Sequence, residues 1–309
     1  MSKILTITFN PAIDKSTSVD NLIYEKKLKC TNPKFEPGGG GINVARAIKR
    51  LGGESTALYL AGGYTGNYFT ELLVKENIQT IAVPCKNHTR ENLIVFDEKS
   101  KLQYRFGMPG PVINESEWKD VLNTIEKIND IEFIVASGSI SEGVPVDIFG
   151  RISRIAKLKK IKLIVDSSGD ALKESVDEGL YMLKPNINEL SFLNGAGELR
   201  SEDVEDVARS IISKGKCKFM VISMGAEGAM LITEESTFKI TPPKVNSIST
   251  VGAGDSMVAG IVQSLSLGRS ITESVKYGVS CGTAATMNSG TELCHIVDVE
   301  KIYSQITIK

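Results

Sequence analysis

Residues 249–260 read STVGAGDSMVAG and combine a glycine turn, one carboxylate and the start of an apolar segment. Glycine has no Cβ, so Gly252 and Gly254 allow successive backbone N–H groups to turn toward one point. We expect an amphipathic helix to follow and to end at Gly268. Its apolar face would consist of Val258, Ile261, Val262 and Leu265. The glycines then lie at a helix N-terminus, where unpaired N–H donors and a partial positive charge attract anions such as phosphate.

Asp255 directly follows this glycine turn. A carboxylate beside an incoming phosphate repels it, unless the carboxylate has a chemical task there. Accepting a proton from a hydroxyl group that attacks phosphorus is such a task. The stretch therefore predicts phosphoryl transfer, with Asp255 as the general base.

The composition of the 309-residue chain is typical of a globular enzyme, with 41% hydrophobic and 24% charged residues. Its formal net charge of -1 provides no field that favours nucleic acid or an acidic membrane, so we expect neither as a partner. The first residues, MSKILTITFN, lack the regions of a signal peptide, and no apolar run has the length of a bilayer span. We therefore expect a cytoplasmic protein. The five cysteines include no CxxC pair, which argues against a disulfide framework or structural zinc.

Short runs rich in Ile, Val and Leu alternate with helical patterns along the chain. The strand candidates are residues 3–9, 133–137, 162–168 and 219–225, and clear helical patterns cover residues 118–128 and 204–212. Such alternation predicts the α/β class, with a mostly parallel sheet covered by helices on both faces. Three of the strands end in small or polar clusters, namely SGS, DSSG and SMGAEG. Ligands of open α/β sheets bind at such carboxyl ends.

Two segments interrupt this alternation, at about residues 15–36 and 86–108. They show alternating, hairpin-like patterns, such as ENLIVFDEKSKLQYRF (91–106) with EKSK as its turn. We expect these segments to form a small β-sheet that acts as a lid. Because the chain has no internal repeat and no long polar linker, residues 1–309 are expected to form one domain with these segments inserted.

A second glycine-rich stretch, EPGGGGINVARAIKRLGG, occupies residues 36–53. It predicts a helix that begins after the glycines and ends at Gly52. The residues expected to face inward are Ile42, Ala45, Ile48 and Leu51. Asn43 would lie in the first turn, where its amide can hydrogen-bond sugar hydroxyls. A flexible loop before an ordinary helix explains the same pattern equally well.

Several charged residues in and beside the lid segments are candidates for substrate contact. They are Asp14 in NPAID, Lys27, Arg90 and Arg105. Stabilisation of a turn explains Asp14, and solvated charge explains each cation taken singly. Taken together, the three cations have the chemistry to clamp a phosphate already present on the substrate.

The stretch LKPNINEL (183–190) places Asn186 and Glu189 on one face of a helix that starts after Pro185. These two side chains either cap the helix or hold hydrated Mg²⁺. A nucleotide must be bound without a P-loop or an intact GxGxxG, because the sequence contains neither. His88 and His295 have no second His, carboxylate or Cys at ligand spacing, so we expect no metal site at either.

With these stretches in place, the chain resembles the PfkB branch of the ribokinase-like carbohydrate kinases along its full length. PGGGGINVARAI near the start, and DSSGDAL and STVGAGDSMVAG in the second half, carry the resemblance, and GAGD is its most specific element. KPNINEL matches the NxxE element of that family. YRFGMPG and GTELC are similar to the phosphofructokinase subgroup, in particular to its ATP-dependent minor type.

The resemblance implies a ribokinase-like three-layer α/β/α sandwich with a small β-sheet lid, and homodimerisation through the lids. It also implies ATP-dependent phosphorylation of fructose 6-phosphate at O1, with Mg²⁺ as cofactor and with the sugar phosphate and ATP as partners. Members of the family often bind a monovalent cation such as K⁺ near the nucleotide. Position 292 departs from the pattern, since a close relative has a basic residue where this chain has Glu292, and this leaves the cation dependence open.

The same resemblance implies roles for individual residues. Asp255 would be the base, and N–H groups would be presented to the transferred phosphoryl group by Gly252, Ala253 and Gly254. The sugar phosphate would contact Asp14, Gly39, Asn43, Arg90, Arg105 and Ser139, with Lys27 in addition. Mg²⁺ and the phosphates would be organised by Asn186 and Glu189, often through water. The nucleotide site would be lined by Asn186 together with Lys184, Ser223, Gly225, Gly228, Thr283 and Asn288.

Tagatose 6-phosphate and fructose 1-phosphate kinases are the nearest alternatives, because these sugars offer similar phosphate and hydroxyl contacts. A kinase of an unphosphorylated sugar would leave Arg90 and Arg105 without an anionic partner. A non-catalytic sugar-phosphate sensor would retain the lid but would not need Asp255 or a Mg²⁺-binding pair. A nicotinamide oxidoreductase would need a phosphate loop that this sequence lacks.

Overall fold

The computed structural model of the protein describes residues 3–195, 197, 199–288 and 292–309, so Gly290 and Thr291 of the GTELC stretch lie outside the described residues. Within this part, the chain forms one large sheet of ten strands and a separate sheet of four. The large sheet has the order β14 (Thr307–Ile308), β13 (Thr237–Thr241), β12 (Ala229–Ile232), β11 (Cys217–Ser223), β10 (Leu180–Leu183), β9 (Lys162–Asp166), β8 (Phe133–Ser137), β1 (Ile4–Thr8), β4 (Thr56–Gly62) and β5 (Gln79–Cys85).

The strands of the large sheet run parallel from β5 at one edge through to β11. The remaining strands, β12 to β14, continue the sheet in antiparallel fashion. Strands such as β8, whose sequence FIVAS is buried at every position, are apolar because helices cover both faces of the sheet. The four strands predicted from the sequence are confirmed as β1, β8, β9 and β11.

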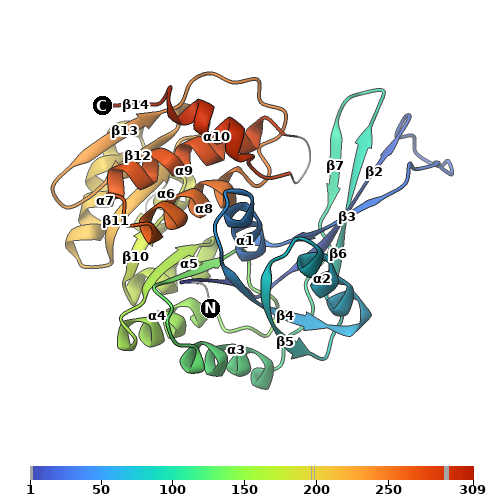
Figure 1. Ribbon diagram of the computed structural model, residues 1–309, viewed down its shortest axis with the longest axis horizontal. Coiled ribbons are helices and arrows are strands. Elements are labelled where there is room, and N and C mark those ends of the chain that lie inside the picture. The colour runs from blue at the N-terminus through green and yellow to red at the C-terminus, as the bar shows by residue number, and fades with distance from the viewer. Residues whose placement is uncertain (1–2, 196, 198, 289–291) are drawn as a thin grey trace.

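Helices pack on both faces of the large sheet and complete a three-layer α/β/α arrangement (Figure 1). One face is covered by α1 (Gly40–Arg50), α2 (Gly63–Lys75), α8 (Ala253–Ser266), α9 (Ile271–Thr286) and α10 (Ile296–Tyr303). The other face is covered by α3 (Glu115–Lys127), α4 (Ile148–Leu158), α5 (Gly169–Asp177), α6 (Ile187–Asn194) and α7 (Val204–Ser213). Two short 3-10 turns are η1 (Ser201–Asp203) and η2 (Gly225–Glu227). The fold class predicted from the sequence is confirmed.

The small sheet stands to one side of the large sheet, beyond α1 and α2 (Figure 1). Its order is β3 (Lys34–Gly38), β2 (Ala12–Val19), β6 (Arg90–Asp97) and β7 (Gln103–Phe106). The EKSK turn lies between β6 and β7, as predicted. Because β2 begins at Ala12 and β3 ends at Gly38, the sheet reaches closer to the glycine stretch than the predicted segment 15–36. Its action as a lid stays a prediction.

Helix α8 corrects one expectation from the sequence, which predicted an amphipathic helix with one apolar face. Every residue from Ser256 to Ser264 is buried, because α8 lies between α1 and α9. Glycines permit this close packing: a Cβ on Gly260 would lie 2.5 Å from Sγ of Cys281, and one on Gly278 would lie 2.3 Å from Cγ1 of Ile261. The helix that carries Asp255 is therefore held on several sides.

Among the described residues, no helix combines the length and apolar character needed to cross a membrane. All five cysteines are free thiols. Three of them are buried, namely Cys217, Cys281 and Cys294, whereas Cys30 is exposed and Cys85 is half-buried.

Candidate active site

The candidate site lies where the strand order of the large sheet reverses. In the large sheet, β4 and β5 lie on one side of β1, whereas β8, β9 and β10 lie on its other side. Ligands of open α/β sheets bind outside the carboxyl ends of the strands at such a switch point. Ser137 ends β8, Asp166 ends β9 and Lys184 follows β10, so adjacent strand ends contribute three polar side chains.

The glycine stretch before α1 brings that helix close to the strand ends. A Cβ on Gly40 would lie 2.4 Å from Oγ of Ser137, and one on Gly41 would lie 2.4 Å from the carbonyl oxygen of Ile7. Gly39 adopts φ of 117°, which favours glycine. The stretch is therefore required for packing, and it places Asn43 in the first turn of α1 at the switch point.

Asp255 lies in the first turn of α8 and faces the same strand ends. Its Oδ2 accepts a hydrogen bond of 2.9 Å from Nδ2 of Asn43, and its Oδ1 lies 3.4 Å from the hydroxyl of Ser137. Oδ1 of Asn43 is buried without a partner among the described residues, so it remains available to a ligand. These side chains adjoin a cavity of about 290 Å³, lined by Gly40, Ser137, Gly138, Ser139, Asp166, Ser167, Ser168, Glu189 and Asp255.

The pKa of Asp255 is raised from 3.8 to about 7. Burial is the largest cause, because it disfavours the charged carboxylate, and the negative charge of Asp166 adds to it. The hydrogen bonds from Asn43 and Ser137 and the charge of Lys184 act in the opposite direction. A carboxylate that titrates near neutral pH is suited to accept and release protons.

The glycine turn before Asp255 caps the N-terminus of α8. Gly252 caps α8 with a left-handed φ of 72°, and a Cβ there would lie 2.7 Å from Cδ2 of Leu293. A Cβ on Gly254 would lie 3.7 Å from Nζ of Lys184, so this cation adjoins the turn. The N–H of Ala253 makes only a long bond of 3.4 Å, to Thr250 O. The phosphoryl contacts assigned to Gly252, Ala253 and Gly254 stay a prediction.

Lys184 is buried below the helix terminus and is paired with Asp166 at 3.2 Å. Burial is the largest single influence and lowers the pKa of the ammonium group, but the charge and hydrogen bond of Asp166 together with the charges of Glu189 and Asp255 outweigh it, and the pKa is raised. The cation therefore persists at the site. Asp166 was not singled out from the sequence, although it ends a predicted strand and opens the polar DSSG cluster.

Asn186 and Glu189 form a reciprocal capping box at the start of α6. The N–H of Glu189 donates to Oδ1 of Asn186 at 2.9 Å, and the N–H of Asn186 donates to Oε2 of Glu189 at 2.9 Å. The capping alternative considered from the sequence thus describes what the two side chains do here. Glu189 also lines the cavity beside Asp255, and burial and Asp166 raise its pKa.

The carboxylates around this cavity fit a hydrated divalent cation better than a directly bound one. In the described part of the chain, no three His, Cys, Asp or Glu side chains lie close enough to bind one metal ion together. Asp166 and Glu189 nevertheless line the same cavity with hard oxygen donors, and their like charges oppose one another. Mg²⁺ keeps several waters and accepts few protein ligands, so this donor set is compatible with it.

The small sheet presents a set of polar side chains on one face. In its register, Asp14 lies opposite both Asn92 and Glu36, and Arg105 lies opposite Ile94. Because side chains alternate along a strand, Asp14, Arg90 and Arg105 point to the same side. Oδ1 of Asp14 accepts a bond of 2.8 Å from Nδ2 of Asn92. Burial raises the pKa of Asp14, against that bond and the charges of the arginines.

Two of the three predicted phosphate-binding cations lie on this face. Arg90 donates to Asn10 O at 3.0 Å and to Met108 O at 3.1 Å, while its buried Nε has no partner among the described residues. Arg105 is exposed on β7 and lowers the pKa of Asp14 through its charge. Lys27 lies elsewhere, in the exposed connection between β2 and β3 at the outer end of the small sheet (Figure 1).

The other predicted ligand residues occupy three places. Ser139 follows β8, where its hydroxyl accepts a bond of 3.1 Å from Asn10 Nδ2. Ser223 ends β11 beside Asn186, and its N–H donates to Pro185 O at 3.0 Å. Asn288 follows α9 and donates to Leu293 O at 3.0 Å.

The predicted glycines and Thr283 of the nucleotide site differ in what surrounds them. Gly225 has a φ of 59° and open space around its missing Cβ. At Gly228, by contrast, a Cβ would lie 2.1 Å from Ile240 O, so packing alone requires this glycine. Thr283 is half-buried in α9. The nucleotide contacts assigned to these residues stay a prediction.

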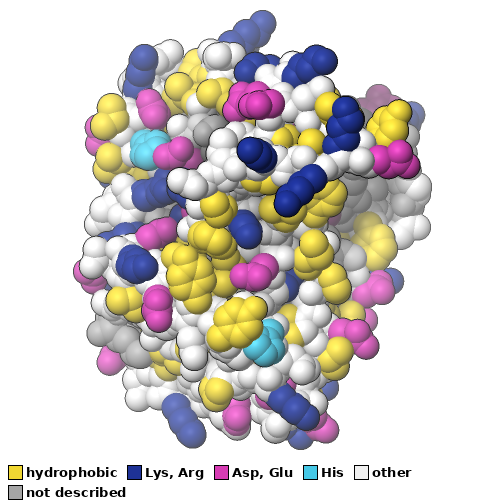
Figure 2. All heavy atoms as spheres, turned by 90° about the vertical axis from the view of Figure 1, so that its right-hand side faces the viewer, with side chains coloured by type: hydrophobic (Ala, Val, Ile, Leu, Met, Phe, Trp, Pro, Cys, Tyr) yellow, Lys and Arg dark blue, Asp and Glu magenta, His cyan; other side chains and the backbone are white. Residues whose placement is uncertain are grey.

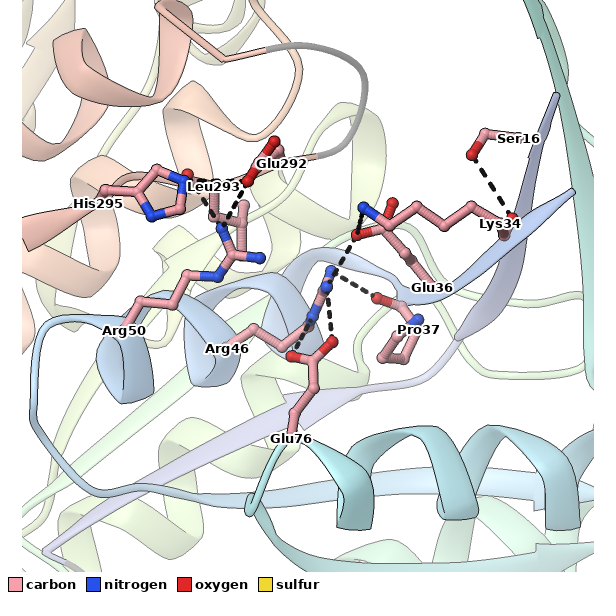
Figure 3. Close-up of polar contacts among 10 residues, drawn as sticks. All are labelled: Ser16, Lys34, Glu36, Pro37, Arg46, Arg50, Glu76, Glu292, Leu293 and His295. Atoms are coloured by element: carbon pink, nitrogen blue, oxygen red, sulfur yellow. Dashed lines mark hydrogen bonds and ion pairs between the residues drawn. The ribbon is translucent and has the colours of Figure 1, made fainter. Parts of the chain in front are cut away.

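Glu292 contacts two cationic or titratable neighbours. Its Oε1 lies 3.0 Å from Nε2 of His295 and 4.0 Å from Nη1 of Arg50 (Figure 3). The sequence indicated no carboxylate at ligand spacing from His295, but Glu292, three residues earlier, lies within hydrogen-bond distance of it. Arg50 also donates to Leu293 O at 3.2 Å, which ties α1 to the segment beside Gly252.

Comparisons with known proteins agree with this geometry. The chain is 42% identical over 308 residues to the ATP-dependent 6-phosphofructokinase isozyme 2 of Escherichia coli (strain K12), covering 99% of this chain and 100% of that protein. It is 31% identical over 307 residues to the 1-phosphofructokinase of Borreliella burgdorferi, covering 99% and 98%. The crystal structure of phosphofructokinase-2 from E. coli in complex with potassium has a TM-score of 0.94 at 43% identity, covering 99% of each chain. Residues 7–297 match the pfkB family carbohydrate kinases, and the chain belongs to that family.

Proposed function

We propose that the protein transfers the γ-phosphoryl group of ATP to O1 of fructose 6-phosphate, giving fructose 1,6-bisphosphate and ADP. The observation that carries this proposal is Asp255, whose pKa is about 7, held by Asn43 at the N-terminus of α8. The arginine-bearing face of the small sheet supplies the cations that a phosphorylated sugar needs. The full-length similarity to an ATP-dependent 6-phosphofructokinase supports the choice of substrate.

Asp255 acts as the base in this mechanism. Its carboxylate accepts the proton of the O1 hydroxyl as O1 forms a bond to the γ-phosphorus. The bond from that phosphorus to the bridging oxygen breaks, and its electron pair leaves with ADP. The N–H groups of residues 252–254 and the ammonium of Lys184 stabilise the negative charge on the transferred group. Asn43 orients the carboxylate through its 2.9 Å bond and offers its free Oδ1 to the sugar.

The sugar phosphate binds between the two sheets. Its phosphate group pairs with Arg90 and Arg105, and Asp14 accepts hydrogen bonds from sugar hydroxyls. Gly39, Asn43 and Ser139 line the opposite wall, with Lys27 reaching the ligand only if its connection moves inward. Closure of the small sheet over the ligand would exclude water and prevent idle hydrolysis of ATP.

The nucleotide lies along the ends of β10 and β11 and the end of α9. Lys184, Asn186, Ser223, Gly225, Gly228, Thr283 and Asn288 are assigned to it. Asp166, Asn186 and Glu189 would hold Mg²⁺ through water, and the ion would neutralise charge on the phosphates. A K⁺ site near the nucleotide is proposed because the similar phosphofructokinase-2 of E. coli is in complex with potassium.

We also propose a homodimer formed through the small sheet. On β7 and the residues that flank it, the exposed hydrophobic side chains are Leu102, Tyr104, Phe106 and Met108. Figure 2 shows hydrophobic side chains gathered in the middle of the side that carries this sheet. An exposed apolar edge strand invites pairing with another chain. Sedimentation of wild type and of Phe106→Glu tests this, because a monomeric wild type would exclude the dimer.

The experiment that tests the activity is ADP release from purified protein with MgATP. The ratio kcat/KM is compared for fructose 6-phosphate, tagatose 6-phosphate, fructose 1-phosphate and ribose. A preference for fructose 6-phosphate, with a product that carries phosphorus on O1 by NMR, supports the proposal. A preference for fructose 1-phosphate would favour the activity named for the relative that is 31% identical. No turnover of any sugar would favour a sugar-phosphate sensor instead.

A further inference from the structure

Arg46 is the largest fully buried side chain in the described part of the protein, with 1% of its surface exposed. Its Nε and Nη2 form a paired contact with the Glu76 carboxylate, at 2.8 and 2.7 Å. Its Nη1 donates to Pro37 O at 3.0 Å, and Nη2 also lies 3.3 Å from Oε1 of Glu36 (Figure 3). A buried ion pair is weak evidence for stability, because desolvation offsets the attraction. The four hydrogen bonds of the buried Arg46 guanidinium therefore suggest a role beyond stability.

The guanidinium joins three separate elements. Glu76 ends α2, Arg46 itself lies in α1, and Glu36 and Pro37 lie in β3 of the small sheet. Lys34, two residues before Glu36, adds an ion pair of 3.2 Å to the same carboxylate. The small sheet is thus anchored to the helices of the large sheet by buried charge as well as by its chain connections.

This anchor lies next to the residues proposed to bind the sugar phosphate. Glu36 is opposite Asp14 in the β2–β3 register, and two residues later a Cβ on Gly38 would lie 2.3 Å from Oδ2 of Asp14. The Asp14 carboxylate therefore packs directly on the backbone of β3 at Gly38, and a change in the placement of β3 would alter its surroundings. Arg46 is also one of the cations that lower the pKa of Asp14, which agrees with their proximity.

The same helix also holds the base. Asn43 precedes Arg46 by three residues on α1, which is less than one helical turn, and donates to Asp255. One helix therefore contacts the base through Asn43 and the small sheet through Arg46. The distance between the two halves of the site depends on how rigidly these two contacts are held.

We propose that Arg46 is a positioning residue, which fixes the small sheet so that its sugar-phosphate ligands face Asp255. The inference rests on the proposed function, because it concerns the affinity of the same site for the same substrate. Arg46 acts through β3 and touches no reacting atom. Its loss should weaken the binding of fructose 6-phosphate far more than the binding of ATP, which lies on the other side of the switch point.

A matched control separates this role from a merely structural one. Arg209 in α7 also makes several bonds, to Glu205 at 2.8 Å, to Thr237 at 2.8 Å and to the carbonyl oxygens of residues 233 and 234. It links α7 to the turn between β12 and β13, away from both halves of the site. Arg209→Met therefore removes an arginine with a similar set of bonds, although a less buried one, without moving the small sheet.

The test compares Arg46→Lys, the charge-compensated double variant Arg46→Met with Glu76→Gln, and Arg209→Met. The double variant removes the charge of Glu76 together with that of Arg46, and the buried Glu36 keeps its ion pair with Lys34, which guards against loss of folding. We measure Tm, kcat and the KM of each substrate, and the Kd of fructose 6-phosphate by calorimetry without nucleotide. KM and Kd for the sugar phosphate should rise at least about tenfold in the double variant, with the KM of ATP within about threefold of wild type.

Arg46→Lys should fall between wild type and the double variant, because lysine keeps the charge but cannot make the paired contact. Arg209→Met should lower Tm and leave both KM values unchanged. An unchanged Kd for the sugar phosphate in the double variant would overturn the inference. If the wild-type protein neither binds nor phosphorylates fructose 6-phosphate, the proposed function is overturned instead. If another sugar phosphate proves to be the substrate, the same measurements with that sugar phosphate test the inference about Arg46.

Discussion

The two halves of the candidate site, the strand ends around Asp255 and the face of the small sheet, are built differently. Around Asp255, the charged groups already pair with protein groups, through the 2.9 Å bond from Asn43 and the 3.2 Å pair of Lys184 with Asp166, although Oδ1 of Asn43 has no partner among the described residues. On the small sheet, Arg90 retains a buried Nε without a partner, and no ion pair of Arg105 is found among the described residues. We therefore expect the first half to be organised before substrate arrives, and the second to be completed by the phosphate of the substrate.

This difference follows from how each half is supported. Helix α8 is buried on nearly all sides between α1 and α9, so Asp255 has little freedom to move. The small sheet is held against α1 and α2 mainly through β2 and β3, while β7 at its edge is exposed. Changes at the strand ends should therefore act mainly on kcat, and changes on the small sheet mainly on the KM of the sugar phosphate.

The largest effect is expected from Asp255→Asn. The variant keeps an oxygen that can accept the bond from Asn43, but it removes the base. We expect kcat to fall by about two to four powers of ten, the usual contribution of a positioned general base, with little change in ATP affinity. Steady-state kinetics with ATP and fructose 6-phosphate measures this. Turnover close to that of wild type would exclude Asp255 as the base.

The same variant should be more stable than wild type above neutral pH. The pKa of Asp255 is about 7 in the folded protein, against the ordinary value of 3.8 expected in the unfolded chain. Between these two pH values the folded state therefore binds more protons than the unfolded state. Stability contributed by this group is therefore lost as the pH rises toward 7. Removing the carboxylate should raise the free energy of unfolding at pH 8 by up to about 4 kcal/mol, as seen by urea titration. A less stable variant would contradict the raised pKa.

The next effect in size concerns the small sheet, and Arg105→Met tests it. Arg105 is exposed and makes no backbone bond comparable to those of Arg90, so its loss should leave the fold intact. A charged hydrogen bond to phosphate contributes about 1.5–3 kcal/mol, so the KM of the sugar phosphate should rise about 10- to 150-fold. Lys99→Met, in the turn of the same hairpin, is the matched control. A fall in kcat with unchanged KM would break the proposed division between the two halves.

The dependence of rate on pH is expected to be smaller still. Asp255 must be deprotonated to act as base, and the pKa of its carboxyl group is about 7. In the free enzyme, log kcat/KM should therefore rise with pH with unit slope below about 7 and level off above it, so that pH 6 gives about a tenth of the plateau. A profile that is flat from pH 5.5 to 8 would show that burial does not control this group.

Much of the fold was predictable from the sequence because its signals are local. The buried strands read as continuous apolar runs, such as FIVAS, and the EKSK turn separates two alternating strands. The same local reasoning gave a wrong prediction for α8. The spacing i, i+3, i+4 and i+7 predicted one apolar face, whereas the helix is buried on all sides from Ser256 to Ser264. Only the packing of Gly260 and Gly278 against neighbouring helices shows that α8 lies in the interior.

The site was predictable in part for a related reason. Asp255 and Asn43 stand beside glycine stretches that mark helix N-termini, so each could be named singly. Their mutual bond joins positions 212 residues apart, and no local pattern reveals it. Asp166 was missed because its role comes from its ion pair with Lys184, which follows the neighbouring strand β10. Arg46 was missed because nothing in the sequence around it indicates that an arginine is buried there.

The smallest effects are expected at Asn186 and Glu189, where capping and ligand binding can be separated. Glu189→Gln keeps an oxygen for the Asn186 N–H but removes a negative charge from the cavity. We expect less than about 0.5 kcal/mol change in the free energy of unfolding. The Mg²⁺ concentration for half-maximal rate should rise up to about tenfold, because the ion loses one attractive charge.

Asn186→Ala provides the complementary change, since it breaks the cap. It should lower the free energy of unfolding by about 1 kcal/mol, measured by urea titration. Asn186→Ala removes the cap and Glu189→Gln removes the charge, so the two effects can be told apart. If only Asn186→Ala changes the Mg²⁺ concentration for half-maximal rate, the cause would be a change in the placement of α6. An unchanged requirement in both would mean that the pair serves only to start the helix, and that Asp166 is the carboxylate which holds the ion.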